Sequence, residues 1–233
     1  MIIRDADHGE PGIEVFMLRR TLNAVFGSGM YVYPGGRVEA TDGDDIDRAF
    51  RLAAIRECFE EAGVLLAHTP GTFETITDGH PALAARVGVH DGSIDLLTLC
   101  QQHDLQPAIE QLVWVAHWIT PKGESSRRFD TRFYLVPAPP GQTSTHDDNE
   151  TIASLWTRPA DALQRQADGE LTMMPPTITT LQMLLPFTSV AQAMTTSRTW
   201  PMPRCVLPKL RLDAEGKLIG IAMPDDADYD TLD

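Results

Sequence analysis

The chain has 233 residues, and its 33 acidic and 19 basic side chains give it a formal net charge of −14. This charge argues against general nucleic-acid binding and against an anionic membrane surface, because both depend on basic side chains. No apolar run approaches the roughly 20 residues that a membrane-spanning helix needs, and no targeting segment is visible. Three widely spaced cysteines indicate a reducing compartment and no zinc site, so we expect a cytoplasmic protein.

The first part of the chain predicts two strands followed by a long helix. The strands are expected at residues 13–18 and at residues 30–33, where Pro34 stops the second one. The helix should begin near Asp45 or Asp47, since an acidic side chain can cap a first turn. Its apolar residues recur at helical spacing, and Gly63 is the glycine expected just past its end.

Turn signals and β-branched or aromatic residues divide the remainder of the chain. Short helices are expected within a polar segment, at residues 81–87, 93–103 and 106–112. Strands are expected after it, at residues 113–120, 128–136 and 151–156. Two more helices follow, at residues 159–163 and about 177–194, and the tail from 205 to 222 offers two short strands.

Three glutamates on the long helix indicate a metal site. Glu57, Glu60 and Glu61 stand at positions i, i+3 and i+4, so they share one helix face. The three anions repel one another unless a cation lies between them, and hard oxygen ligands favour Mg2+ or Mn2+. An ordinary solvated helix face is the alternative, because charge runs usually face water.

The residues around these glutamates resemble the box of the Nudix hydrolase family, which has the pattern Gx5Ex7REUxEExGU with U apolar. Arg56 to Val64 fit the second half of the box, and Gly36 fits its first glycine. Gly36 and Arg56 are 20 positions apart, six more than the 14 of the pattern, which places extra residues between Arg37 and Asp47. The glutamate of the first half has no clear counterpart, because counting from Gly36 gives Asp42 and counting back from Arg56 gives Arg48.

The resemblance implies an α/β fold, the Nudix α/β/α sandwich with a mixed sheet. The domain would cover residues 1–200, with a helical insertion at about 68–112 that caps the cleft and a C-terminal extension at 201–233. Three stretches look like one branch in particular, the acyl-coenzyme A diphosphatases of animal peroxisomes and their bacterial relatives. These stretches are Trp118 to Pro121, Arg127 to Tyr134 and Pro175 to Thr177.

The branch implies hydrolysis of the diphosphate in coenzyme A or its thioesters. Two alternatives stay open. One is a Nudix enzyme acting on ADP-ribose, dinucleotides or nucleoside triphosphates, and the other is a non-catalytic Nudix module that senses a nucleotide. The intact set of Glu57, Glu60 and Glu61 argues against the sensing module. A small-molecule nucleotide is the expected partner, and a homodimer is expected because many relatives dimerise.

The resemblance also gives roles to single residues of the box. Glu57 and Glu61, helped by Glu60, would hold Mg2+ or Mn2+, and the carbonyl of Gly36 is a further candidate ligand. Arg56 would orient a glutamate through a two-pronged contact, the alternative being a surface salt bridge.

Outside the box the roles are more open. Glu150 resembles the late glutamate that many Nudix enzymes bring to the metal, although a solvated acidic loop explains it as well, and His146 is a second candidate base. Arg128 and Arg132 share one face of a strand and could meet substrate phosphates or pair with acidic side chains. Trp114 and Trp118 are expected in the core or in a dimer contact, with adenine stacking as the alternative.

Overall fold

The computed structural model describes residues 1–6, 11–24, 27–124 and 128–232, so Arg127 of the stretch named above lies outside the described residues. The chain divides into two compact units. Unit 1 comprises Met1–Val113 and Tyr134–Arg198, and unit 2 comprises Trp114–Phe133 and Thr199–Asp233.

Strand β2 (Ile13–Arg20) organises the sheet of unit 1. Its Val15 pairs with Ile3 of β1 (Ile2–Asp5) and also with Thr157 of β8 (Thr151–Thr157), so β1 and β8 lie on opposite edges of β2. The short β3 (Tyr31–Val32) pairs with β2 on the edge that β1 occupies further along. The end of β7 (Asp130–Pro137) runs parallel to β1, whereas β2 pairs antiparallel with β1, β3 and β8, and the sheet is therefore mixed.

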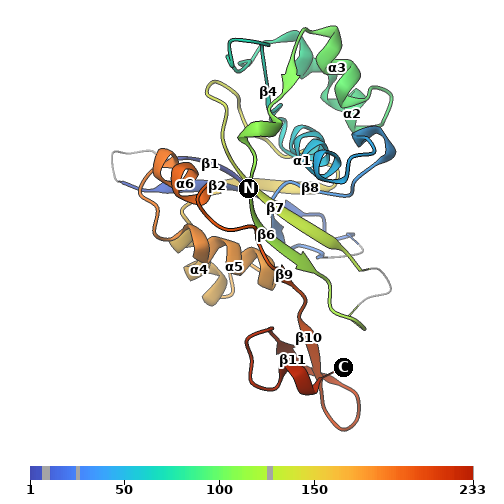
Figure 1. Cartoon of the computed structure of the whole chain (residues 1–233), viewed down its shortest axis with the longest axis vertical. Coiled ribbons are helices and arrows are strands. Elements are labelled where there is room, and N and C mark those ends of the chain that lie inside the picture. The colour runs from blue at the N-terminus through green and yellow to red at the C-terminus, as the bar shows by residue number, and fades with distance from the viewer. Residues whose placement is uncertain (7–10, 25–26, 125–127, 233) are drawn as a thin grey trace. The chain divides into compact units, whose positions relative to one another are not determined.

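Helices cover both faces of this sheet. Val15, Phe16, Met17 and Leu18 are consecutive in β2 and all are at most 1 % exposed, which requires cover on both sides of the strand. Figure 1 shows α1 (Ile46–Ala62), α2 (Arg86–His90) and α3 (Leu96–Gln102) on one side of β1, β2 and β8. On the other side lie α4 (Pro159–Ala167) and α5 (Pro175–Leu184). Helix α6 (Val190–Ser197) begins beside β1, where the N–H of Val190 donates to Oδ1 of Asp5 at 2.7 Å. The predicted α/β/α layering is confirmed.

Helix α1 begins and ends where its sequence predicts. The Asp45 side chain accepts a hydrogen bond from the Arg48 backbone N–H at 2.8 Å and caps the first turn. Gly63 has a φ of +71° and donates its N–H to the carbonyl of Phe59 at 3.0 Å, which ends the helix in a left-handed cap. Leu52, Ile55 and Phe59 are buried on the core side of the helix.

The predicted insertion is less helical than its sequence suggests. It contains the 3-10 helix η2 (Pro81–Ala85), then α2 and α3, and the helix expected at 106–112 is wrong. Instead, β5 (Gln106–Pro107) pairs with β4 (Ala67–His68), and η3 (Ile109–Gln111) follows. The pairing of Ala67 with Pro107 and of His68 with Gln106 holds the start of this segment in an extended conformation.

Two other expectations need correction. The single helix expected at about 177–194 is two helices, because Pro186 cannot continue α5 and Ser189 caps α6 by accepting from the N–H of Gln192 at 3.2 Å. Strand β1 was not expected at all, since only three apolar residues, Met1 to Ile3, precede the charged Arg4 and Asp5.

Unit 2 contains most of β6 (Val113–Ile119), which pairs in parallel with β9 (Cys205–Val206). The tail then forms the predicted hairpin, β10 (Lys209–Leu212) with β11 (Leu218–Ala222), and ends near the 3-10 helix η4 (Tyr229–Thr231). Throughout the described ranges, every helix is too short or too polar to span a membrane.

The cap of α1 gives a stability prediction. Replacing Asp45 with Ala should lower the free energy of unfolding by about 1 kcal/mol, because an N–H of the first turn loses its partner. Chemical denaturation of the wild type and the variant measures this difference. Asp44→Ala is the matched control, since Asp44 is exposed beside the cap and does not cap the helix. Equal losses in the two variants would mean that the cap contributes nothing.

Candidate active site

The last two turns of α1 place one arginine and three glutamates in a largely buried cluster. Arg56 is 5 % exposed, Glu60 8 % and Glu61 2 %, and the side chain of Glu57 is 13 % exposed. The alternative of a solvated helix face is therefore wrong. Burial of so many ionised groups is costly unless they are paired or bind a cation.

Arg56 is the centre of this cluster. Its Nη1 donates to Oε1 of Glu57 at 3.0 Å and to Oε1 of Glu60 at 3.1 Å. Its Nε and Nη2 donate to the two oxygens of Asp42, each at 3.2 Å, and Nη2 also reaches the carbonyl of Arg37 at 2.7 Å. The two-pronged contact expected of Arg56 thus falls on an aspartate, and the same guanidinium holds two of the three glutamates.

Asp42 is a site residue to which the sequence analysis gave no role. It ends the 3-10 helix η1 (Ala40–Asp42), is 3 % exposed, and accepts the N–H of Glu39 at 2.7 Å. Arg48, the other position that counting allowed, is exposed. Of the two positions that counting gave, Asp42 is therefore the one that contacts Arg56, a choice that the sequence alone left open. The extra residues lie between Asp42 and Arg56.

The two glycines before α1 lie directly against the carboxylates. The N–H of Gly35 donates to Oε2 of Glu61 at 3.0 Å. A Cβ at Gly36 would lie 2.2 Å from Oε1 of Glu57, closer than any side chain can be. Gly36 is thus the residue whose missing side chain makes room for the Glu57 carboxylate, which brings the backbone close to it.

Burial raises the pKa of all three glutamates. It is the main cause of the rise to about 7 for the pKa of Glu57 and to about 8 for the pKa of Glu61. The pKa of Glu60 is raised for the same reason, although Arg56 opposes the rise. Repulsion between Glu57 and Glu61 adds to the effect, and the N–H of Gly35 reduces it for Glu61. One guanidinium does not compensate this much negative charge, so a cation is favoured here.

The donors fit a hard divalent cation in their chemistry. They are carboxylate oxygens with uncompensated charge, and the backbone of Gly36 lies against one of them. In the part of the chain that the structure describes, no three His, Cys, Asp or Glu side chains are arranged as a ready metal-binding set. In this structure Arg56 binds Glu57 and Glu60, and the N–H of Gly35 binds Glu61.

Arg20, at the end of β2, is a second residue that the sequence analysis missed. Its charge lowers the pKa of Glu61, which places it within electrostatic reach of the cluster. Its Nε is buried and makes no hydrogen bond to the described residues. Nothing in its local sequence separates it from Arg19 beside it, because only the fold shows which of the two faces the glutamates.

The two candidate bases lie in the loop before β8. Glu150 is exposed, and its charge contributes to the raised pKa of both Glu57 and Glu61, so it too lies within electrostatic reach of the cluster. His146 has local partners instead. Its Nε2 lies 3.0 Å from Oδ1 of Asp148, and its Nδ1 lies 3.1 Å from Oγ of Ser154. The geometry therefore favours Glu150 over His146.

The predicted phosphate-binding arginines belong to unit 2, whereas the glutamates belong to unit 1. Arg128 donates from Nε to the carbonyl of Thr120 at 2.8 Å. The guanidinium of Arg132 lies 4.5 Å from the ring centroid of Trp114, a cation–π contact. Trp118 is 4 % exposed, as expected of a core residue. Substrate binding by the two arginines stays a prediction.

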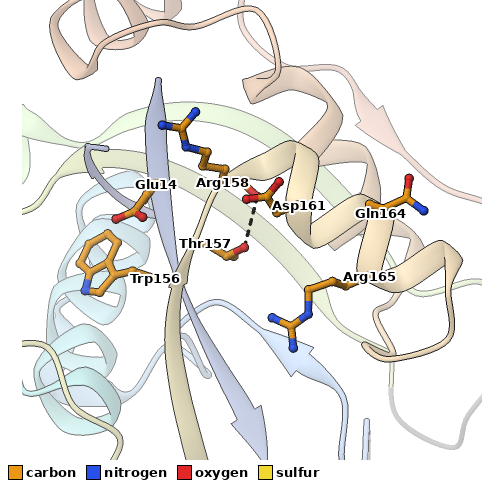
Figure 2. Close-up of a pocket in the computed structure, with 7 residues that line it drawn as sticks. All are labelled: Glu14, Trp156, Thr157, Arg158, Asp161, Gln164 and Arg165. Atoms are coloured by element: carbon orange, nitrogen blue, oxygen red, sulfur yellow. Dashed lines mark hydrogen bonds between the residues drawn. The ribbon is translucent and has the colours of Figure 1, made fainter. Parts of the chain in front are cut away.

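A hollow of about 540 Å3 lies elsewhere in unit 1, between β2, β8 and α4 (Figure 2). Its lining residues are Glu14, Trp156, Thr157, Arg158, Asp161, Gln164 and Arg165. None of these is a residue predicted for the site, so the chemistry of α1 and the size of this hollow point to different places. We place the site at the glutamates of α1, because buried ionisable groups with raised pKa values are typical of functional sites.

The fold and the carboxylate helix define a Nudix domain. A solved Nudix hydrolase from Alicyclobacillus acidocaldarius superposes with a TM-score of 0.74 at 27% identity, covering 87% of this chain and 95% of that one. The sequence model of the NUDT19 Nudix domain matches residues 43–184, more than half of the chain. The chain therefore belongs to the NUDT19 Nudix domain family.

Two animal proteins are among its similar relatives, and each is named acyl-coenzyme A diphosphatase NUDT19. The one from Gallus gallus is 35% identical over 158 residues, which covers 61% of this chain and 42% of the relative. The one from Homo sapiens is 33% identical over 156 residues, which covers 62% of this chain and 41% of the relative. The chain thus spans about two fifths of the length of these two relatives.

Gly36 gives the first prediction for the site. Gly36→Ala should displace the Glu57 carboxylate and weaken Mn2+ binding by roughly 10-fold, because groups that orient a metal ligand typically contribute 10- to 100-fold in affinity. Electron paramagnetic resonance of free Mn2+ measures the affinity. Gly35→Ala is the matched control, since a Cβ there meets nothing within 4 Å. Similar affinities in the two variants would contradict the role of Gly36.

The raised pKa values give a second prediction, on stability without metal. Between pH 4.5 and about 8 the folded state binds more protons than the unfolded chain, because the pKa values of Glu57 and Glu61 lie above the ordinary 4.5. The free energy of unfolding should therefore fall as pH rises through this range, by the order of a few kcal/mol. Thermal and chemical denaturation at pH 5, 6.5 and 8 in a chelating buffer measures it.

The control for this pH effect is Glu61→Gln, which removes one of the two titrating carboxylates. Its stability should depend less on pH than that of the wild type, and excess Mn2+ should restore stability at pH 8 in the wild type alone. An equal slope in both proteins would show that other groups cause the pH dependence.

Proposed function

We propose that the protein is a divalent-metal-dependent pyrophosphohydrolase that cleaves the diphosphate of coenzyme A or an acyl-coenzyme A. The observation that carries the proposal is the buried cluster around Arg56, in which three glutamates with raised pKa values lie against Gly35 and Gly36. Membership of the NUDT19 Nudix domain family supports the reaction class.

Glu57, Glu60 and Glu61 would hold the metal, Mg2+ or Mn2+, with the carbonyl of Gly36 as a further ligand. When bound, the ion supplies charge neutralisation at the diphosphate and a more acidic water. Arg56 keeps two of the ligands in place through its shared hydrogen bonds. Glu150 is the candidate that takes the proton of the attacking water, since it is exposed and within electrostatic reach of the cluster.

In the reaction, water adds to one phosphorus and the bond from that phosphorus to the bridging oxygen breaks. The products from coenzyme A are 3′,5′-ADP and phosphopantetheine. Arg20 is a candidate for binding a substrate phosphate, because its Nε is buried, close to the glutamates and without a hydrogen bond in the described part of the chain. Arg128 and Arg132 keep this role as candidates from the sequence alone.

The names of the chicken and human relatives support coenzyme A compounds as the substrate class. A product screen by mass spectrometry with Mg2+ or Mn2+ tests this choice. It offers coenzyme A, acyl-coenzyme A thioesters, ADP-ribose, NADH and nucleoside triphosphates in parallel. Release of 3′,5′-ADP mainly from the coenzyme A compounds is the expected result. Preference for another compound would discard coenzyme A, and no turnover would favour the nucleotide-sensing module.

Glu61→Gln tests the catalytic assignment. The substitution should lower metal-dependent turnover by at least about 100-fold, because a metal ligand loses its charge. Stability without metal should stay equal or rise at pH 8. Glu61 is buried, and the amide oxygen of the glutamine can still accept the N–H of Gly35. Turnover and thermal unfolding of the same preparation measure both. Full turnover in the variant would refute the assignment.

The setting of the protein is also part of the proposal. The three cysteines, Cys58, Cys100 and Cys205, are all free thiols, which supports a reducing compartment such as the cytoplasm. The homodimer expected from the resemblance stays a prediction.

A further inference from the structure

Two residues of the 68–112 insertion reach the carboxylate cluster. Arg86 and His90 are the first and last residues of α2 and stand four positions apart, so their side chains project from one face of the helix. This face is directed at two segments that each carry proposed catalytic carboxylates. One is the C-terminal end of α1, and the other is the loop of residues 145–150.

Arg86 joins these two segments through hydrogen bonds to the backbone. Its Nε donates to the carbonyl of Glu60 at 3.0 Å, and its Nη2 donates to the carbonyl of Glu61 at 2.9 Å. Carbonyls in the last turn of a helix lack partners within it, and a cation suits the negative end of the helix. The same guanidinium donates to the carbonyl and the hydroxyl of Thr145 at 3.0 and 3.3 Å.

His90 also lies between the end of α1 and the 145–150 loop, and its contacts there are with side chains. Its Nδ1 lies 4.0 Å from Oε2 of Glu60, the oxygen that Arg56 leaves unused. Its Nε2 lies 3.0 Å from Nδ2 of Asn149, the neighbour of Glu150. The amide nitrogen of Asn149 is a donor, so it is paired with Nε2, and Nδ1 is the ring nitrogen that faces Glu60. This Nδ1 is buried and has no hydrogen-bond partner in the described residues.

Other hydrogen bonds join the start of the insertion to the residues just before the 145–150 loop. The side chain of Gln142 binds the backbone of Leu65 and the carbonyl of Ile76, and Asp78 accepts both the N–H and the hydroxyl of Thr143. The N–H of Thr145 also donates directly to the carbonyl of Ala62 at 2.9 Å. The insertion is therefore joined to residues 142 and 143 as well, in addition to the contacts that Arg86 and His90 make.

We propose that Arg86 and His90 are positioning residues, which fix the Glu57, Glu60 and Glu61 end of α1 relative to the loop that carries Glu150. The catalytic role of these two residues rests on the proposed function. Their contacts with α1 and with the 145–150 loop, called the clamp below, do not. It gives the insertion a direct part in the chemistry, in addition to the substrate-capping role expected from sequence. An insertion that only covered the substrate would have no need to bind the last carbonyls of the catalytic helix.

Arg86→Gln tests the clamp. Turnover number should fall about 10- to 100-fold and Mn2+ affinity about 10-fold, the range typical of residues that orient metal ligands, while KM changes little. Hydrogen exchange at the amide of Thr145 should become faster, because its bond to Ala62 loses support. Activity assays, electron paramagnetic resonance of free Mn2+ and hydrogen-exchange mass spectrometry of the full chain measure these three effects.

Arg51→Gln is the matched control. Arg51 also lies on α1 and donates to a carbonyl of the insertion region, that of Leu112 at 2.6 Å, but at the half of the helix away from the glutamates. This variant should lose stability as Arg86→Gln does, while its turnover number and Mn2+ affinity stay within about 2-fold of the wild type, as expected for a site without shared partners. Equal losses of turnover and affinity in both variants would overturn the proposal.

His90→Leu provides a second test if Arg86→Gln does not fold. It should lower turnover number and Mn2+ affinity in the same direction, and unchanged values would overturn the proposal. Failure of the proposed function has a different signature, because the wild type would then turn over none of the compounds screened. Mn2+ affinity and hydrogen exchange at Thr145 would still show whether Arg86 and His90 hold the two segments together. If the wild type also bound no Mn2+, faster exchange in Arg86→Gln would support the clamp and unchanged exchange would overturn it.

Discussion

The contact of Arg56 with Asp42, Glu57 and Glu60 is the interaction on which the rest of the site depends. One planar guanidinium holds three carboxylates from two segments, the η1 turn and α1. A lysine could not replace it, because a single ammonium group lacks the fixed donor directions that these contacts use. Without this centre, four buried anions would face one another with only distant cations to offset them.

The cluster is a compromise between stability and function. The fold buries Glu61 almost completely and gives it one backbone N–H, which is too little to keep its pKa at the ordinary value. A neutral residue there would be easier to fold, but it would bind no cation. Strained electrostatics of this kind occur where a ligand supplies the missing charge, and stability is then linked to that ligand.

The sequence predicted the parts of the fold that local chemistry determines. The caps of α1 at Asp45 and Gly63, the strand at Ile13 and the β10–β11 hairpin all follow from residue type and spacing. The fold overrode local pattern where partners came from far away in the chain. Gln106–Pro107 became a strand because Ala67–His68 is available to pair with it.

The same distinction separates the site residues. The box glutamates and Arg56 are adjacent on one helix, so their spacing alone indicated a common site. Asp42 could be recognised only once its contact with Arg56 was known, since two ways of counting gave different positions. Arg20 and Arg86 carry no local signal, because their partners lie 41 and 25 or 26 positions away and are joined only by the fold.

Gly63 lies where α1 ends and where Arg86 of the insertion contacts α1. Its left-handed backbone already disfavours a side chain, and a Cβ there would also come within 3.0 Å of Nη1 of Arg86. The absence of a side chain at Gly63 thus has two effects. It allows the left-handed turn that ends α1, and it leaves space for the guanidinium that binds the last carbonyls of the helix. The residue that ends the catalytic helix therefore also allows the inserted segment to approach that helix closely.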